Sequence, residues 1–232
     1  MISASAVAAM RTGYTIHDPF PHIVIDNFLK PEWIQPVLDS VRAMKSEDAQ
    51  VKFIDPNGSY EFNKFAFDSG FNETLTQLFK ELVGEDFTST VEMLSGIRPL
   101  IRNDTRLLGA GVHRIHSDGF LQMHTDFNTY PHPQHGHLDR RMNLLLYLNP
   151  DWKDEYNGHL RLGTQKSIAP ILNRCVIFNT TNKSVHGHPV PLSTPPGVCR
   201  ESIAVYYYTP NTNGSVDFEG DPPHTTLWHK TE

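Results

Sequence analysis

The chain has 232 residues, a formal net charge of −6 and a pI near 6.1. Because a net negative surface repels polyanions, we expect a small-molecule or a peptide or protein substrate as partner, and neither nucleic acid nor a membrane. Two cysteines are too few for a disulfide framework or a four-cysteine zinc site, and they fit a reducing, cytoplasmic location. The first ten residues lack the features of a signal peptide, so we expect a frayed end there.

The first hundred residues are predicted to be rich in helix. Residues 22–25 form a short apolar strand, and Pro31 suits the first turn of a following helix, where its missing N–H costs nothing. Apolar residues then recur at helical spacing in three stretches. These are Ile34, Val37, Leu38, Val41 and Met44, then Leu75, Leu78, Phe79 and Leu82 ahead of Gly84, and then Phe87, Val91 and Leu94.

From Gly109 onward, short apolar or alternating runs separated by Gly, Pro, Asn and Asp predict antiparallel strands joined by turns. The number and spacing of these runs favour a double-stranded β-helix, the cupin-like jelly roll. We therefore predict a mainly β fold with flanking helices, in one domain over residues 1–232. It would comprise a helical buttress over 1–100, a jelly-roll core over 101–210 and a tail over 211–232. The strands are expected near residues 111–115, 121–124, 142–148, 159–162, 175–178 and 202–208.

Two histidines and one aspartate, remote in sequence, form the candidate metal site. Residues two apart in a strand face the same way, so His124 and Asp126 can point together into the mouth of the barrel. A distant strand must supply the third ligand; His186 is the preferred candidate, and His188 in the same loop is the alternative. Two imidazoles and one carboxylate can occupy one face of an octahedral iron(II) and leave the opposite face open, which makes such a site catalytic.

An arginine follows the last of these histidines. Arg200 lies just ahead of an apolar strand, with Ser202 on the same face. Its planar guanidinium can hold a carboxylate by two parallel hydrogen bonds, and beside a ferrous site the expected carboxylate is the distal end of 2-oxoglutarate. Tyr147 and Asn143 share a face of another strand. Each is predicted either to add a hydrogen bond to the cosubstrate or to lie in the core with its polar group satisfied.

Further polar residues near these positions are weaker candidates. Residues 127–140 follow Asp126 directly and are expected to overhang the metal as a lid. Its histidines, His132, His135 and His137, are expected mostly in solvent; the alternatives are that they recognise substrate or form an adventitious second metal site. Arg141 is predicted to contact substrate or to be a surface charge. His113 and His116 precede a glycine on a neighbouring strand. They are expected either to bind the metal-proximal carboxylate of the cosubstrate or to take hydrogen bonds in the core.

Four stretches are longer and more specific than these single residues. They are residues 19–29 (PFPHIVIDNFL), 119–128 (GFLQMHTDFN), 140–152 (RRMNLLLYLNPDW), and 186–189 (HGHP) followed by 200–209 (RESIAVYYYT). Through them the chain resembles the iron(II)- and 2-oxoglutarate-dependent dioxygenases, specifically the prolyl-4-hydroxylase-like branch, over nearly its whole length. Two features depart from the pattern: His159 replaces a glycine that often follows Gly158, and the spacing from His186 to Arg200 is longer than in prolyl hydroxylases proper.

The resemblance implies a jelly-roll enzyme with iron(II) on His124, Asp126 and His186 and with 2-oxoglutarate on Arg200. Dioxygen would be the oxidant and ascorbate a candidate reductant. The expected reaction is hydroxylation of an unactivated C–H bond of a prolyl or other amino-acid or peptide substrate, with release of succinate and CO2. Because Asp126 is retained, no ligand position is vacated for a halide, and we expect hydroxylation rather than halogenation.

Two other functions are compatible with the same three ligands. One is a cupin-type isomerase or hydrolase that uses a different metal as a Lewis acid, and the other is a non-catalytic metal-binding sensor domain. Arg200 and Ser202 argue against the first, because that chemistry needs no clamp for a dicarboxylate.

Overall fold

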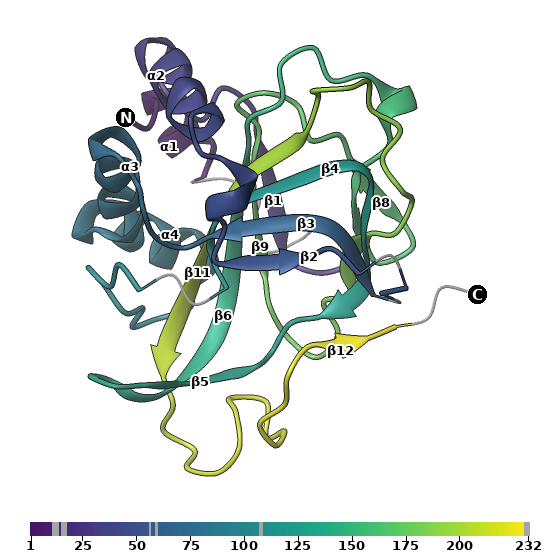
Figure 1. Cartoon of the computed structure of the whole chain (residues 1–232). Helices are drawn as coiled ribbons and strands as arrows, with labels where there is room; N and C mark the ends of the chain where they lie inside the picture. Colours follow the sequence, from purple (N-terminus) through teal and green to yellow (C-terminus); the bar gives the residue numbers. More distant parts are fainter. Residues whose placement is uncertain (11–13, 15–17, 56, 59, 107–108, 230–232) are drawn as a thin grey trace.

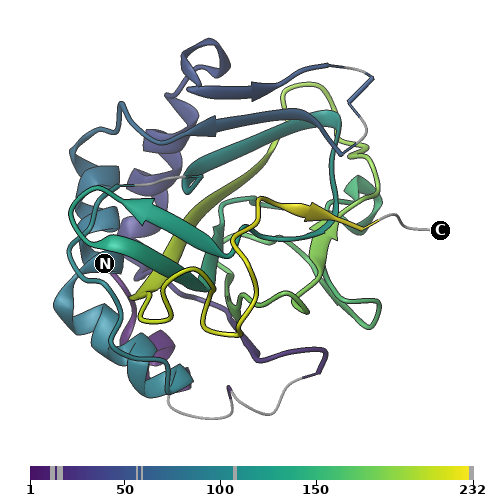
Figure 2. The ribbon, with the colours of Figure 1, turned by 90° about the horizontal axis from the view of Figure 1, so that it is seen from below.

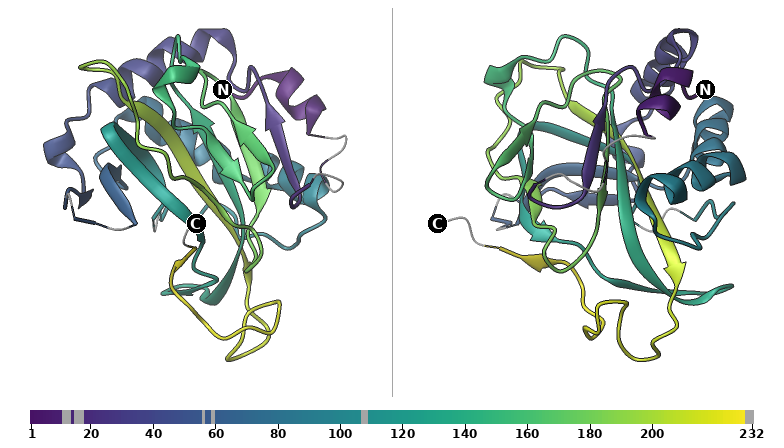
Figure 3. Two further views of the ribbon diagram at one scale, coloured as in Figure 1. Left: turned by 90° about the vertical axis from the view of Figure 1, so that its right-hand side faces the viewer. Right: turned by 180° about the vertical axis from the view of Figure 1, so that it is seen from behind.

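The structure, a computed structural model, describes residues 1–10, 14, 18–55, 57–58, 60–106 and 109–229. Within these residues the helices gather on one side of a curved antiparallel sheet (Figure 1), as the views from below (Figure 2) and from behind (Figure 3) also show. None of these described helices is long and apolar enough to cross a membrane. They are α1 (Ala4–Ala9), α2 (Pro31–Arg42), α3 (Glu73–Val83) and α4 (Glu85–Ser95), with short 3₁₀ turns at Ser46–Asp48 and Asp154–Tyr156.

The strands follow the order β1-β9-β6-β11-β4-β10-β7-β8 across the sheet. In addition, β3 and β12 pair with β4, β2 pairs with β3 and β5 pairs with β6. As predicted, the fold is mainly β with a helical buttress. The strand bounds are β1 (His22–Ile25), β2 (Val51–Phe53), β3 (Glu61–Phe67), β4 (Gly111–Thr125), β5 (Thr129–His132), β6 (Gly136–Tyr147), β7 (Leu160–Leu162), β8 (Lys166–Ile168), β9 (Cys175–Asn179), β10 (His186–His188), β11 (Arg200–Pro210) and β12 (Leu227–Trp228).

Most predicted elements are present, with altered bounds. The three helical patterns correspond to α2, α3 and α4, and Gly84 ends α3 as expected. The two strands predicted near 111–115 and 121–124 are one long strand, β4. The hairpin of β2 and β3 lies inside the segment that was predicted to be helix-rich, and no strand was predicted there.

The N-terminal residues are ordered, so the expectation of a frayed end is wrong. Ser3 caps α1 by accepting a hydrogen bond from the N–H of Ala6 at 3.1 Å, and the ammonium group of Met1 lies 2.7 Å from the carboxylate of Glu81 on α3. Met10 is buried in the main core. A six-residue helix is marginal by itself, and these tertiary contacts, which composition does not reveal, hold it in place.

Alternation along the central strands divides the apolar core from the interior of the barrel. On β6, Met142, Leu144 and Leu146 belong to the core that the helices cover. Asn143 and Leu145, which point the other way, line a cavity inside the barrel. The strands that anchor the helices therefore also present polar side chains to the interior.

A buried ion pair joins the helical layer to the sheet. Arg114 of β4 binds Glu201 of β11 (Nη2–Oε1 2.7 Å). It also donates to the carbonyl oxygens of Val41 at 2.8 Å and Met44 at 2.6 Å, at the C-terminal end of α2. Each side chain of the pair is 8% exposed. Arg114 thus supplies a donor to the carbonyl of Met44, just after α2, and a second one to the carbonyl of Val41, which also accepts from the N–H of Met44.

We expect Arg114→Met to destabilise the protein by about 3–5 kcal/mol, because it leaves the Glu201 carboxylate buried without its cation and removes the donors to the carbonyls of Val41 and Met44. The double variant Arg114→Met/Glu201→Leu should regain part of this loss, because no unpaired charge remains. Urea denaturation of the three proteins measures both quantities. A single variant as stable as the wild type would contradict the assigned role.

Candidate active site

The three predicted metal ligands converge in the structure. His124 lies near the end of β4, Asp126 follows that strand, and His186 is the first residue of β10. β4 and β10 are antiparallel neighbours, and His186 is the direct partner of His124 in their register. Pairing of two strands therefore brings together two imidazoles that are far apart in sequence.

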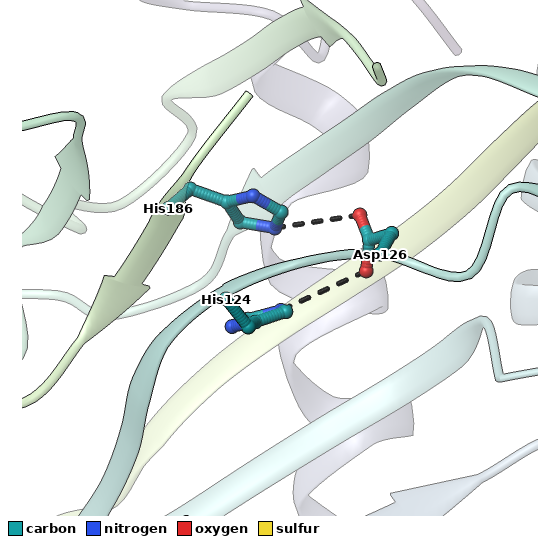
Figure 4. A group of neighbouring side chains, drawn as sticks. All are labelled: His124, Asp126 and His186. Carbon is teal, nitrogen blue, oxygen red and sulfur yellow. Dashed lines mark ion pairs between the residues drawn. The ribbon is translucent and has the colours of Figure 1, made fainter. Parts of the chain in front are cut away.

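The ligand atoms of the triad are spaced as a small metal ion requires. Asp126 lies between the two rings, with Oδ1 3.6 Å from Nε2 of His124 and Oδ2 3.4 Å from Nε2 of His186 (Figure 4). One ligand atom from each residue lies within 4.8 Å of the other two. Adjacent ligands about 2.1 Å from an ion are on the order of 3 Å apart, so a small inward movement completes the coordination. Two imidazoles and one carboxylate are the donor set of a non-haem iron(II) site.

Both imidazoles are oriented by the main chain. Nδ1 of His124 lies 2.8 Å from the carbonyl oxygen of Gln122, and Nδ1 of His186 lies 2.9 Å from that of Ser184. Such bonds place the ring proton on Nδ1 and leave Nε2 for a metal. Burial lowers the pKa of His186 to about 4, against the opposing effect of Asp126. The ring is therefore neutral near pH 7, as metal binding requires.

Asp126 is held by a buried polar network. Its Oδ2 accepts a hydrogen bond from Nδ2 of Asn143 at 2.7 Å and lies 3.1 Å from Nη2 of Arg140. Arg140 also donates to Oδ1 of Asn143, and its guanidinium stacks 3.5 Å from the ring centroid of Tyr206 and 4.4 Å from that of Phe127. Burial alone would raise the pKa of Asp126, but Arg140 and then the two histidines outweigh it and hold that pKa well below 3.8. The carboxylate is ionised and preoriented.

The triad lines a cavity of about 220 Å³ inside the barrel. This is less than the ~300–1,000 Å³ typical of sites for drug-sized ligands. Arg200, Ser202, His113 and Asn143 line the same cavity, and so does His188. The structure thus brings most of the predicted site residues to one place.

Arg200 is buried where the cavity meets β11. It donates from Nε to the carbonyl of Gly158 at 2.8 Å and from Nη2 to the phenol oxygen of Tyr147 at 3.4 Å. Burial raises the pKa of Tyr147, although Arg200 opposes this. The phenol keeps its proton at neutral pH and can donate it to a bound acceptor. Tyr147 is a core aromatic ring that does not line the cavity, and its hydroxyl contacts Arg200; a hydrogen bond from it to the cosubstrate stays a prediction.

Gly158 is required for this placement of Arg200. Its φ is +71°, and a Cβ there would lie 2.5 Å from Cδ2 of Leu192 and 3.0 Å from Cδ of Arg200. Any side chain would therefore push the guanidinium out of position. His159, which stands where the family often has glycine, lies outside the cavity with Nε2 3.3 Å from Asp154.

The two histidines of β4 separate to opposite faces. His113 lines the cavity, with Nε2 3.1 Å from the carbonyl of Gly109, and burial lowers its pKa to about 3. His116 lies on the other face, with Nε2 2.9 Å from Oγ of Ser46 and Nδ1 3.3 Å from Sγ of Cys199. The idea that His116 binds cosubstrate is therefore wrong, since residues three apart on a strand point to opposite sides.

Arg141 also does not line the cavity, and its neighbour Arg140 does. The register between β6 and β11 shifts at this point: Tyr207 pairs with Met142, but Tyr208 pairs with Arg140. The extra residue is a β-bulge that reverses the alternation, so that Arg140 shares the face of Asn143. Arg141 instead stacks over Phe218 at 3.7 Å in the C-terminal segment. Contact between Arg141 and substrate stays a prediction, for a part of the substrate outside the cavity; Arg140 was missed because the bulge is invisible to a strict period of two.

The histidine-rich segment, residues 127–140, forms the hairpin of β5 and β6. Its two ends, Phe127 and Arg140, line the cavity, whereas none of its three histidines does. His132 is buried, with Nε2 3.1 Å from Asp104, while His135 and His137 are exposed.

The mouth of the cavity contains residues that the sequence did not indicate. Lys64 and Glu61 of β3 form an ion pair at 2.9 Å, and both line the cavity. Trp228 of β12 pairs with His124 and stacks on Tyr60 with ring centroids 4.9 Å apart. β12 was missed because a two-residue strand has no periodicity.

Comparison with known families identifies the fold and the enzyme class. The model of the 2OG-Fe(II) oxygenase superfamily matches residues 110–208, a span that contains the triad and Arg200. These residues form a 2OG-Fe(II) oxygenase domain. The chain is thus a 2-oxoglutarate-dependent dioxygenase, whose cofactors are iron(II), 2-oxoglutarate and dioxygen, as the sequence predicted. No curated protein matches the chain.

Solved structures share the jelly roll at low sequence identity. A prolyl-4-hydroxylase from Pseudomonas putida is 16% identical, with a TM-score of 0.57 over 88% of this chain and 97% of that one. HygX from Streptomyces hygroscopicus, solved with nickel, 2-oxoglutarate and hygromycin B, is 12% identical, with a TM-score of 0.54 over 99% and 98% of the two chains. A prolyl hydroxylase from Trichoplax adhaerens in complex with a peptide fragment is 19% identical, with a TM-score of 0.53 over 88% and 87%. The predicted fold is confirmed.

Gly158→Ala tests the contact between Gly158 and Arg200. We expect it to weaken 2-oxoglutarate binding at least tenfold, because the added Cβ displaces the guanidinium and 1.4 kcal/mol already corresponds to a factor of ten. Gly136→Ala is the matched control, since its φ is also +71° and its Cβ would meet nothing within 4 Å. Calorimetric titration measures the affinity; equal losses in the two variants would attribute the effect to backbone strain alone.

Proposed function

We propose that the chain hydroxylates an unactivated C–H bond of an amino-acid or peptide substrate, a prolyl residue being one candidate. One oxygen atom of dioxygen would enter the product as hydroxyl, and the other would enter 2-oxoglutarate, which would leave as succinate and CO2. The observation that carries this proposal is the convergence of His124, Asp126 and His186 in the cavity that also contains Arg200.

The proposed ligands are these three residues, and their geometry supports the assignment. Bound there, iron(II) would supply the oxygen-activating chemistry of the family. His124 and His186 would each offer Nε2, because Nδ1 of each ring faces a carbonyl oxygen. Asp126 would offer the carboxylate oxygen that Arg140 and Asn143 orient.

Arg200 is the proposed anchor for the distal carboxylate of 2-oxoglutarate. Its burial makes it a strong partner, since a charge removed from water binds a counterion more tightly than an exposed one. The hydroxyls of Tyr147 and Ser202 would add hydrogen bonds; Ser202 pairs with both Tyr147 and His113 across the sheet.

The proposed substrate class is based on solved structures that have a similar fold. They include prolyl-4-hydroxylases and one prolyl hydroxylase in complex with a peptide, whereas HygX was solved with hygromycin B. A cavity of 220 Å³ supports entry of one side chain or ring at a time, with the rest of a larger substrate outside.

Succinate release tests the function directly. With iron(II), 2-oxoglutarate and oxygen, the wild type is expected to form succinate and, in the presence of its substrate, a product heavier by one oxygen atom. Asp126→Ala and removal of the metal by a chelator should each abolish both signals, because the oxygen-activating centre is lost. Mass spectrometry with chloride present provides the readout. A chlorinated main product would refute hydroxylation, and metal binding without any succinate would favour the isomerase, hydrolase or sensor functions.

Asn143→Leu tests the support of Asp126. It removes the N–H that holds Oδ2 and the carbonyl that binds Arg140, and we expect metal affinity to fall roughly 10–100-fold. Titration with Ni²⁺ measures the affinity without turnover. Leu145→Ala serves as a control, since Leu145 lines the same cavity but does not touch Asp126; a similar loss there would point to a general disturbance of the cavity.

A further inference from the structure

His188 is a buried polar residue that lines the cavity. It belongs neither to the proposed metal triad nor to the proposed anchoring of 2-oxoglutarate by Arg200. It lies at the end of β10, two residues after His186, and only 3% of its surface is exposed. It lines the same cavity as the triad and Arg200. Its position therefore makes it part of the site.

The ring of His188 differs from those of the two metal-ligand candidates. Neither of its nitrogens has a hydrogen-bond partner in another residue of the described chain. His124 and His186, by contrast, are each fixed through Nδ1 by a carbonyl oxygen. A metal-binding histidine almost always has such an orienting bond on its second nitrogen. This difference supports His186 rather than His188 as the third ligand.

An unpaired buried imidazole is costly by itself. A buried polar group without a partner destabilises the folded state, whereas an apolar side chain of similar size would fill the same space without that penalty. The cost is removed if a bound molecule supplies the missing partner. His188 is thus better explained by a ligand than by the packing of the ligand-free protein.

The charges around His188 indicate what that ligand is. Among the charged groups that act on the ring, Arg200 has the strongest influence, followed by Lys64 and then the imidazole of His124. Lys64 is paired with Glu61, whereas Arg200 contacts only a carbonyl and a phenol oxygen among the described residues, so its buried charge favours an anion in the cavity. His188 lines the same cavity as Arg200, and a carboxylate oxygen is an acceptor for an imidazole N–H.

We propose that His188 is a binding residue for 2-oxoglutarate and donates a hydrogen bond to one of its carboxylate oxygens. The proposal rests on the proposed function, since it requires that the cavity accept this cosubstrate. The ring would then act together with Arg200, so that the dicarboxylate is held at more than one point along its length. It would not bind the metal.

The test compares His188→Leu with His188→Gln and with the exposed His137→Leu, which makes the same chemical change far from the cavity wall. Calorimetry of 2-oxoglutarate binding to the Ni²⁺-loaded, full-length protein is the main readout. We expect about tenfold or greater loss of affinity in His188→Leu, because hydrogen bonds to charged groups are the strong ones. His188→Gln should recover much of the loss through its amide N–H, and His137→Leu should bind as the wild type does.

Two further measurements separate binding from other roles. Ni²⁺ affinity without cosubstrate should be unchanged in His188→Leu, and the melting temperature of the ligand-free variant should be equal to or above that of the wild type, because an unpaired polar group has been removed. Unchanged 2-oxoglutarate affinity, loss of Ni²⁺ binding, or a melting temperature several degrees lower would each overturn the proposal. If the wild type itself does not bind 2-oxoglutarate, the proposed function fails rather than the role of His188.

Discussion

The pairing of β10 with β4 is the contact on which the site depends. It places His186 directly opposite His124, and β10 is only three residues long. The two strands approach closely at Gly187, where a Cβ would lie 2.6 Å from the carbonyl oxygen of Gln122 and 2.9 Å from that of Leu121. Any larger residue would force the strands apart and separate the imidazoles. A glycine between two histidines is thus what allows residues from distant parts of the chain to share one ion.

Charge compensation around Asp126 completes the site before any metal arrives. A buried carboxylate without a partner would take up a proton, and a protonated acid is a poor ligand. Arg140 prevents this at 3.1 Å, and its own burial is compensated by the rings of Tyr206 and Phe127. Asn143 then fixes the orientation of the same carboxylate. Asp126 is therefore ionised and His186 neutral, as a cation requires, so that a small inward movement is the reorganisation that binding needs.

The sequence predicted the helices and strands in which apolar residues follow a regular period, and it missed the features that interrupt such a period. Helical spacing located α2, α3 and α4, and apolar alternation located β1, β6, β9 and β11 with small errors in their bounds. The convergence of the triad could be expected because two imidazoles and one carboxylate together form the donor set of a non-haem iron(II) site. Arg140 could not be chosen over Arg141, since a single bulge in β6 reverses which residue faces inward. The packing of α1 depends on Glu81, which no local pattern connects with the N-terminus.

The rigid and the adaptable parts of the site come from different elements. Arg140 and Arg200 lie on β6 and β11, whose opposite faces belong to the core that the helices cover, and such positions change little. His124 and His186 lie on the neighbouring paired strands β4 and β10. The mouth is instead formed by β3 and the short C-terminal strand β12, which meet along the same edge of β4: Glu61 pairs with Leu121 and Trp228 with His124. β12 contributes only two residues to that edge, so its position depends on few hydrogen bonds. The proposed ligands thus lie on inner strands and the mouth lies at an edge of β4; because Trp228 pairs with His124 and their ring centroids are 5.2 Å apart, a change in β12 acts directly on one of those ligands.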